Sequence, residues 1–226
     1  MGREPVFSVF MKLLFTGFEP ATEGAESPTS RWIFDLSELA PESVIVRTVL
    51  LPATWDGAFA ALQPLLGQGW DAVVCLASKR CDQLAIERVA VNENDVSQKD
   101  SEGRRPRSKV IVDGGDAGYW TGLPYRELGL RLTERQIASA ASHSAGGGLG
   151  NHVFYQLMRW IDRSGQTVVG GLVQVPEAAA AIDANKERRR AFLDCIVASV
   201  GRSADAADSL SVNVARLQRL KESPTP

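Results

Sequence analysis

Few side chains in this 226-residue chain could act as nucleophiles or proton carriers. Its cysteines are Cys75, Cys81 and Cys195, and its histidines are His143 and His152. A cysteine hydrolase needs a thiolate, a histidine that accepts and returns a proton, and a group that orients that histidine. Cys75 and Cys195 lie in apolar patterns, so we expect both to be small core residues. The cysteines also lack metal-type spacing, which predicts free thiols and no metal site.

The stretch SHSAGGGLGNHVFY, residues 142–155, looks like a turn that enters a helix. Its glycines do not fit G-x-G-x-x-G, and no Lys-Ser or Lys-Thr follows, so a phosphate-binding loop is not predicted. His143 lies between Ser142 and Ser144, but neighbours on an extended segment point to opposite sides, which argues against a Ser-His pair. We expect His152 to pack or to lie on the helix surface. The start of the helix still offers free amide groups to a carboxylate.

Strands and helices alternate along most of the chain. Apolar runs and turn signals predict strands at Lys12–Phe15, Ser43–Leu51, Asp71–Ala77, Leu84–Val91, Ile137–Ser142 and Thr167–Val175. Helical spacing predicts helices from Thr29 to the stop at Pro41, from Trp55 to a kink or end near Pro64, and over Tyr125–Gln136, Asn151–Arg163 and Glu177–Val200. Ser97–Pro124 is expected to be a long polar loop with a short hairpin. The alternation predicts an α/β fold with a mostly parallel sheet covered on both faces.

Composition limits the classes of partner. The chain has 25 Lys and Arg against 27 Asp and Glu, a net charge near −2, which gives no basis for binding nucleic acid or an anionic membrane. No apolar run approaches the ~18 residues that a membrane span needs. Free thiols favour a reducing, cytoplasmic setting. We expect an N-terminal extension at residues 1–10, a single domain at 11–203 and a polar tail at 204–226.

Five stretches in order resemble the pyroglutamyl peptidase I family, the pyrrolidone-carboxylate peptidases. They are TGFEP (16–20), IERVAVN (86–92), GYWTGLP (118–124), SHSAGGGLGNHVFY (142–155) and VQVP (173–176). The likeness runs from about residue 11 to about residue 200. It implies a three-layer α/β/α sandwich with a mostly parallel mixed sheet, phosphorylase/hydrolase-like. It also implies a cytoplasmic cysteine peptidase that removes an N-terminal pyroglutamate, usually as a homotetramer, without metal or organic cofactor.

The resemblance places two catalytic positions on residues that cannot do this chemistry. The family's cysteine falls at Gly150, which has no side chain, and its histidine falls at Gln174, whose amide cannot shuttle a proton. Glu87 matches the acidic member, whose role is to orient that histidine. Phe18 matches one aromatic residue that holds the pyroglutamyl ring, and the second aromatic position is Ala21.

The loop after the strand ending at Ala77 also departs from the family. The segment ASKRCD, residues 77–82, replaces a glycine-containing loop that carries an arginine near the oxyanion, a role that Arg80 could take. Cys81 lies near the expected site but matches no nucleophile of the family.

Three hypotheses follow. The first is a catalytically inactive member of the family that binds a small molecule or a peptide N-terminus, or acts through the surface of a homo-oligomer. The second is an active hydrolase with a repositioned nucleophile, Ser144 or Cys81. The third is a structural or partner-binding protein that uses the loop 103–109, although its basic run, Arg104, Arg105, Arg107 and Lys109, is more typical of a solvated loop.

Overall fold

The computed structural model describes residues 10–20, 26–97, 99–178 and 184–201. Six strands form one sheet in the order β2-β1-β3-β8-β4-β7. The central strand β8 pairs parallel with β3 and antiparallel with β4, and β4 pairs parallel with β7, so two strands run against the other four. The strands are β1 (Met11–Phe18), β2 (Val44–Leu51), β3 (Ala72–Lys79), β4 (Leu84–Glu87), β7 (Ser139–Ser142) and β8 (Val169–Pro176).

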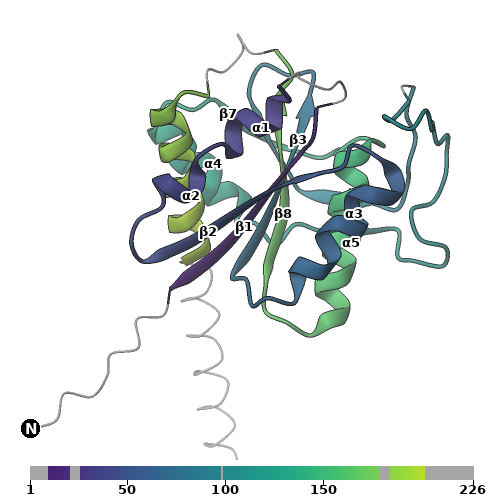
Figure 1. Cartoon of the computed structure of the whole chain (residues 1–226), viewed down its shortest axis with the longest axis horizontal. Coiled ribbons are helices and arrows are strands. Elements are labelled where there is room, and N and C mark those ends of the chain that lie inside the picture. Colours follow the sequence, from purple (N-terminus) through teal and green to yellow (C-terminus); the bar gives the residue numbers. More distant parts are fainter. Residues whose placement is uncertain (1–9, 21–25, 98, 179–183, 202–226) are drawn as a thin grey trace, which may run out of the picture.

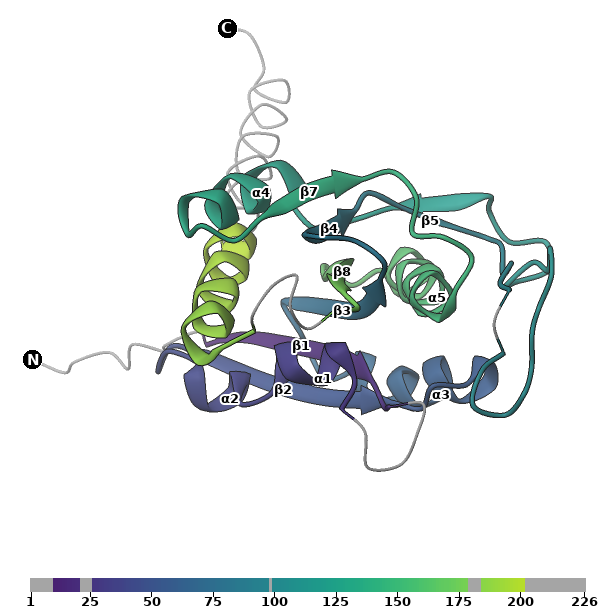
Figure 2. The same cartoon turned by 90° about the horizontal axis from the view of Figure 1, so that it is seen from above.

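Helices cover both faces of this sheet (Figures 1 and 2). One face carries α3 (Trp55–Leu66) and α5 (Leu149–Ser164), whose apolar side chains pack on Leu14, Val73 and Leu172. The other face carries α1 (Pro28–Ile33), α2 (Leu36–Leu39), α4 (Tyr125–Glu134) and a helix at residues 186–201. Two separate apolar cores result, one on each side of the sheet. The predicted three-layer α/β/α sandwich with a mostly parallel mixed sheet is confirmed.

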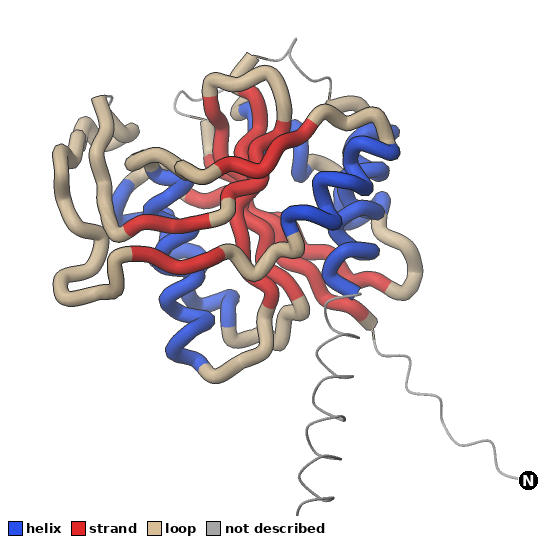
Figure 3. The backbone as a smooth tube through the Cα atoms, turned by 180° about the vertical axis from the view of Figure 1, so that it is seen from behind, coloured by secondary structure: helices blue, strands red, loops and turns tan. Residues whose placement is uncertain are grey.

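The strand predicted at Leu84–Val91 is two strands. Strand β4 ends at Glu87, and β5 (Val89–Val91) leaves the main sheet to pair antiparallel with β6 (Gly118–Trp120). Figure 3 shows this small sheet from behind as two red strands from which a long tan loop extends. The prediction of a hairpin within Ser97–Pro124 was wrong. Strand β6 lies in that segment, but it pairs with β5, which lies before it in the sequence. The loop between them, residues 92–117, is called the long loop below.

The helix predicted from Thr29 is interrupted. Asp35 adopts a left-handed conformation, φ 55°, which separates α1 from α2. Aspartate tolerates this conformation better than most residues, and both its carboxylate oxygens accept from Arg189 at 2.8 and 2.9 Å. Helix α3 continues past Pro64 to Leu66.

The last predicted helix begins later than Glu177. Glu177 and Ala178 are bent, residues 179–183 lie outside the description, and helical structure starts at residue 186. The Asn185 side chain caps it by accepting from the backbone N–H of Arg188 at 3.0 Å. Most of the predicted N-terminal extension and all of the tail at 204–226 also lie outside the described residues. None of the described helices is both long and apolar enough to cross a membrane.

Candidate functional site

A pocket of about 810 Å³ opens where the carboxyl ends of β1, β3 and β8 meet the start of α5. Its walls include Phe18 from β1, Ala77 from β3, Gln174 from β8 and Gly150 from α5, with Asp100 of the long loop on the far side. The carboxyl ends of strands are the usual place for ligands in open α/β sheets. The volume falls within the roughly 300–1,000 Å³ of small-ligand sites.

Gly150 has no room for a side chain in this backbone. A β-carbon at that position would lie 2.5 Å from the Cβ atom of Ala77 and 3.7 Å from Cδ2 of Leu172. The first of these distances is well inside van der Waals contact, so any larger residue would require β3 or α5 to move. Helix α5 starts at Gly148 without a side-chain cap from the described residues, and Gly148, Leu149 and Gly150 all line the pocket.

Gln174 is held firmly but only through its nitrogen. The side chain is 4% exposed, and Nε2 donates to the carbonyl of Ala145 at 2.9 Å. Oε1 is buried and has no hydrogen-bond partner among the described residues. This bond ties β8 to the turn before α5 and leaves one buried acceptor unsatisfied.

Glu87 is fully buried at the end of β4, and its partner is a lysine. Its Oε1 accepts from Lys79 Nζ at 3.3 Å, and the same ammonium donates to the carbonyl of Ser144 at 2.9 Å. Lys79 ends β3 and is 35% exposed, whereas Glu87 has no exposed surface. Glu87 does not line the pocket. The structure therefore links the carboxylate to Lys79 and to the turn.

The remaining residues of the predicted site differ in whether they line the pocket. Phe18 is half-buried at the end of β1 and lines the pocket. Arg80 points away: its side chain is 86% exposed, pairs with Glu177 at 3.5 Å, and is not part of the pocket wall. Ala21 lies outside the described residues.

Three comparisons with known proteins agree. A family model described as Pyroglutamyl peptidase matches residues 11–210. The chain belongs to the pyroglutamyl peptidase family. A pyrrolidone-carboxylate peptidase from Thermosipho melanesiensis is 33% identical over 172 residues, 74% of this chain and 83% of the relative, and one from Bacillus subtilis is 32% identical over 168 residues, 73% and 78%.

Solved structures of the family share the fold. The pyroglutamyl peptidase I crystal structure from Bacillus amyloliquefaciens covers 84% of this chain and 95% of its own, with a TM-score of 0.76 and 26% identity. A mutant pyrrolidone carboxyl peptidase from the hyperthermophile Pyrococcus furiosus gives the same TM-score and identity over 85% of this chain and 99% of its own.

This member of the pyroglutamyl peptidase family has no activated thiol in the described part of the chain. Burial raises the pKa of Cys75 to about 11 and also raises those of Cys81 and Cys195. Cys81 Sγ donates to the carbonyls of Gln83 at 3.1 Å and Lys79 at 3.5 Å, and these hydrogen bonds require the protonated thiol. A raised pKa means less thiolate, the reactive form, near neutral pH.

The two histidines also lack a nucleophile to activate. His143 Nδ1 lies 3.0 Å from Nη1 of Arg88, a donor, so its ring faces the guanidinium rather than Ser142 or Ser144. His152 is buried beside Trp55, with Nε2 2.7 Å from the side-chain amide nitrogen of Gln156. Burial lowers its pKa to about 4, which keeps the ring neutral.

The long loop forms one wall of the pocket, which the sequence did not reveal. Asp100 accepts from the backbone N–H of Trp55 at 3.2 Å and from that of Arg104 at 2.7 Å. Arg104 pairs with Asp56 of α3 and with Glu102, and Arg107 pairs with Asp95 at 2.9 Å. Two of the four basic residues, Arg104 and Arg107, are therefore paired with nearby carboxylates, which reduces the net positive charge of this loop.

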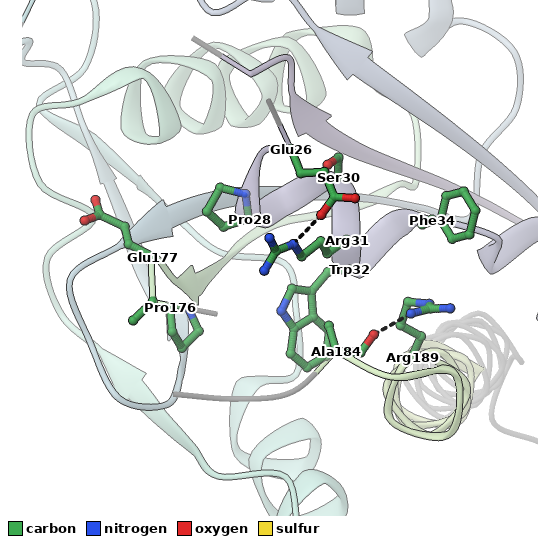
Figure 4. A pocket seen from close by; sticks show the side chains of 11 residues that line it. Glu26, Pro28, Ser30, Arg31, Trp32, Phe34, Pro176, Glu177, Ala184 and Arg189 are labelled. Atoms are coloured by element: carbon green, nitrogen blue, oxygen red, sulfur yellow. Dashed lines mark hydrogen bonds and ion pairs between the residues drawn. The ribbon is translucent and has the colours of Figure 1, made fainter. Parts of the chain in front are cut away.

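A second pocket, of about 510 Å³, lies on the opposite layer between α1 and the helix at 186–201 (Figure 4). Its wall includes Trp32, Arg31 and Arg189, and Arg31 pairs there with Glu26 at 2.8 Å. Its described lining residues include no cysteine or histidine. Nowhere in the described part of the chain do three histidine, cysteine or acidic side chains group as a metal site would require.

Proposed function

We propose that this chain is a non-hydrolytic member of the pyroglutamyl peptidase family that binds an intact peptide N-terminus or a related small molecule in the 810 Å³ pocket. The observation that carries the proposal is that Gly150 and Gln174 both line this pocket. By the family resemblance these residues take the places of the nucleophile and the base. Neither can attack a carbonyl or carry a proton.

The surroundings of both residues support the loss of chemistry. A β-carbon at residue 150 would collide with Ala77. Glu87, which by resemblance would orient a histidine, binds Lys79 through Oε1, and its Oε2 is buried without a partner in the described structure. If only one catalytic side chain had been replaced, we would expect the other catalytic positions to keep their space and their hydrogen-bonding partners.

The pocket itself supports binding. It is open, is lined by Phe18 and Trp55, and presents polar groups at Gln174 and at the start of α5. Apolar walls with a few convergent polar groups are typical of small-ligand sites. The relatives are named pyrrolidone-carboxylate peptidases, so the ligand we propose is a peptide that begins with pyroglutamate.

Purified protein assayed with a fluorogenic pyroglutamyl amide tests the proposal. We expect no turnover above that of buffer, together with binding of a pyroglutamyl peptide measured by calorimetry. The control is a Glu87→Gln variant expressed and purified identically, because a contaminating host peptidase would act equally in both preparations. Turnover in the wild type that disappears in Glu87→Gln would show an active hydrolase and defeat the proposal.

The repositioned hydrolase is disfavoured by the site. Burial raises the pKa of Cys81, and His143 contacts Arg88 rather than a serine. This alternative still makes a separate prediction, covalent labelling of Ser144 or Cys81 by an acylating probe. Intact-mass spectrometry without a labelled species at saturating probe would exclude it.

We propose further, from the family resemblance, that the protein acts in the cytoplasm as a homo-oligomer. Light scattering after size-exclusion chromatography tests the second point. A monomer mass of about 24.4 kDa at micromolar concentration would contradict it.

A further inference from the structure

We propose that Thr29 and Ser27 are positioning residues for Phe18, the aromatic side chain that the end of β1 contributes to the pocket of about 810 Å³. The two hydroxyl groups bind the backbone of Phe18 and thereby fix the place of its ring in the pocket wall. The effect of this placement on ligand affinity rests on the proposed function. The hold on Phe18 itself is a property of the protein without ligand and can be measured separately.

Strand β1 loses one of its two neighbouring strands before it reaches the pocket. It pairs with β2 as far as Phe18, but with β3 only from Leu13 to Thr16. The N–H of Glu19 donates to the carbonyl of Leu51 in β2. Because the backbone groups of successive residues in a strand point to opposite sides, those of Phe18 point away from β2, to the side where β3 no longer pairs. These two groups need partners from another element.

Two hydroxyl groups at the start of α1 supply these partners. Thr29 Oγ1 accepts from the N–H of Phe18 at 2.9 Å, and Ser27 Oγ donates to the carbonyl of Phe18 at 2.7 Å. The two hydroxyl oxygens lie 3.1 Å apart, and Thr29 Oγ1 is also 3.3 Å from the same carbonyl. Thr29 is 1% exposed and Ser27 7%, so both bonds lie in a low dielectric, where they are stronger than in water. The start of α1 therefore replaces β3 as the neighbour of the last residue of β1.

The residue before Phe18 allows α1 to come this close to the strand. A β-carbon at Gly17 would lie 2.9 Å from Thr29 Oγ1 and 3.2 Å from Cδ1 of Ile33, so a larger residue would push α1 away. Ser27 is also the N-cap of α1, since its Oγ accepts from the N–H of Ser30 at 3.0 Å. Because Ser27 has this second role in the helix, Thr29 is the residue on which the positioning is best tested.

The place of Phe18 matters because its ring is the more accessible of two in the pocket. Phe18 and Trp55 are the aromatic side chains among the described lining residues. Trp55 is 8% exposed and its ring contacts that of His152, whereas Phe18 is half-buried. A side chain that is already held in place loses less conformational freedom when a ligand packs against it, and this raises affinity. The two hydroxyl groups are therefore expected to strengthen binding without contacting the ligand.

Amide hydrogen exchange and calorimetry on the full chain test the assignment. Thr29→Val removes the hydroxyl at nearly the same shape, and Thr133→Val removes an exposed hydroxyl from α4 as the control. In Thr29→Val we expect the exchange of the Phe18 amide, followed by NMR without ligand, to accelerate by about tenfold. We expect the Kd of pyroglutamyl-alaninamide to rise by about tenfold as well. Thr29→Ser should recover most of both losses, and Thr133→Val should match the wild type.

A Phe18→Leu background separates positioning from general stability. If Thr29 acts through the ring, Thr29→Val should have little further effect on Kd there, whereas a loss of stability would weaken binding equally in both backgrounds. Ser27→Gly, which keeps a residue suited to a helix cap, takes the place of Thr29→Val if that variant does not fold.

Three results would overturn the positioning role while leaving the pocket a binding site. They are wild-type exchange of the Phe18 amide in Thr29→Val, an unchanged Kd, or equal weakening in both backgrounds. Failure of the wild type to bind the probe would instead overturn the proposed function. The exchange of the Phe18 amide would still decide whether Thr29 holds this residue in place.

Discussion

At residue 150 the Cβ atom of Ala77 occupies the space that a β-carbon would need. Two neighbouring elements, β3 and α5, are therefore packed more closely than a cysteine would permit. The close approach at residue 150 is therefore a property of how the two backbones pack and not only of one side chain. Introducing a cysteine here is expected to strain the fold.

Gly150→Ala tests this close approach. We expect it to lower the free energy of unfolding by about 1–3 kcal/mol, the usual cost of overpacking, as measured by urea denaturation. Gly67→Ala is the matched control, because an added Cβ there meets nothing within 4 Å of the described structure. In the double variant Gly150→Ala/Ala77→Gly part of the loss should return. Equal stability of the Gly150 and Gly67 variants would contradict the predicted collision.

The ion pair of Lys79 with Glu87 gives a second prediction at this scale. Lys79→Met leaves a buried carboxylate unpaired and should cost about 1–3 kcal/mol, less than for a fully buried pair because Lys79 is 35% exposed. Glu87→Gln in the same chain should recover part of it, which a double-mutant cycle in urea would measure. Arg80→Met, at an exposed pair next in sequence, should cost almost nothing. Additive losses in the cycle would refute the pairing.

The family resemblance singles out Glu87 but not its partner. The motifs around residues 87, 150 and 174 are local, so a resemblance carries them directly onto the chain. Lys79 lies in a segment that departs from the family, and its contact with Glu87 depends on how β3, β4 and the turn before α5 meet in space. That arrangement is tertiary and leaves no periodic signal in the sequence.

At the scale of elements, helix α5 supports the site through its buried face. His152 lies one turn from the pocket, where Asn94 Nδ2 and Oδ1 are 3.1 and 3.2 Å from Nδ1 and Gln156 Nε2 is 2.7 Å from Nε2. The contact with Gln156 suits a neutral ring that accepts through Nε2. Protonation would turn the second contact into one between two donors.

The lowered pKa of His152 predicts pH-dependent stability. The unfolded chain binds this proton near pH 6.5 and the folded chain only near pH 4, so the stabilisation is complete above pH 6.5 and is lost as pH falls through this window. The loss should reach roughly 2–4 kcal/mol. Urea denaturation at pH 7.5 and 4.5, compared with a His152→Gln variant, isolates this residue. An equal pH dependence in both proteins would contradict the assignment.

The elements themselves were largely predictable, and the exceptions have local causes. Most strand and helix positions followed from apolar spacing and turn residues. The break at Asp35 depends on Arg189, which is 154 residues away, and the split at Arg88 depends on β6 drawing β5 out of the sheet. Such long-range partners decide where a continuous helix or strand pattern is interrupted. Local helix and strand propensities carry no information about them.

At the scale of the whole molecule, the long loop closes one side of the pocket and is held by Asp100. This carboxylate accepts from the backbone of Trp55, Glu102 and Arg104, and so joins the loop to the start of α3. The sequence predicted only a polar loop with a basic run, because its composition carries no sign of where it folds back. Its packing gives the pocket a wall that is separate from the sheet.

Asp100→Ala should loosen this wall. We expect faster tryptic cleavage after Arg104, Arg105 or Arg107, seen as two fragments by mass spectrometry, with little change in thermal unfolding of the rest. Asp113→Ala removes an exposed aspartate of the same loop and serves as the control. Unchanged cleavage in Asp100→Ala would show that the loop is held by other contacts.

The bond between Lys79 and Glu87 occupies only one oxygen of the carboxylate, because Oε2 is buried without a partner in the described structure. A cysteine engineered at residue 150, in contrast, would first have to displace Ala77. We therefore expect that installing a thiol in this fold requires a compensating change in β3, whereas half of the buried carboxylate is still available to a newly introduced donor.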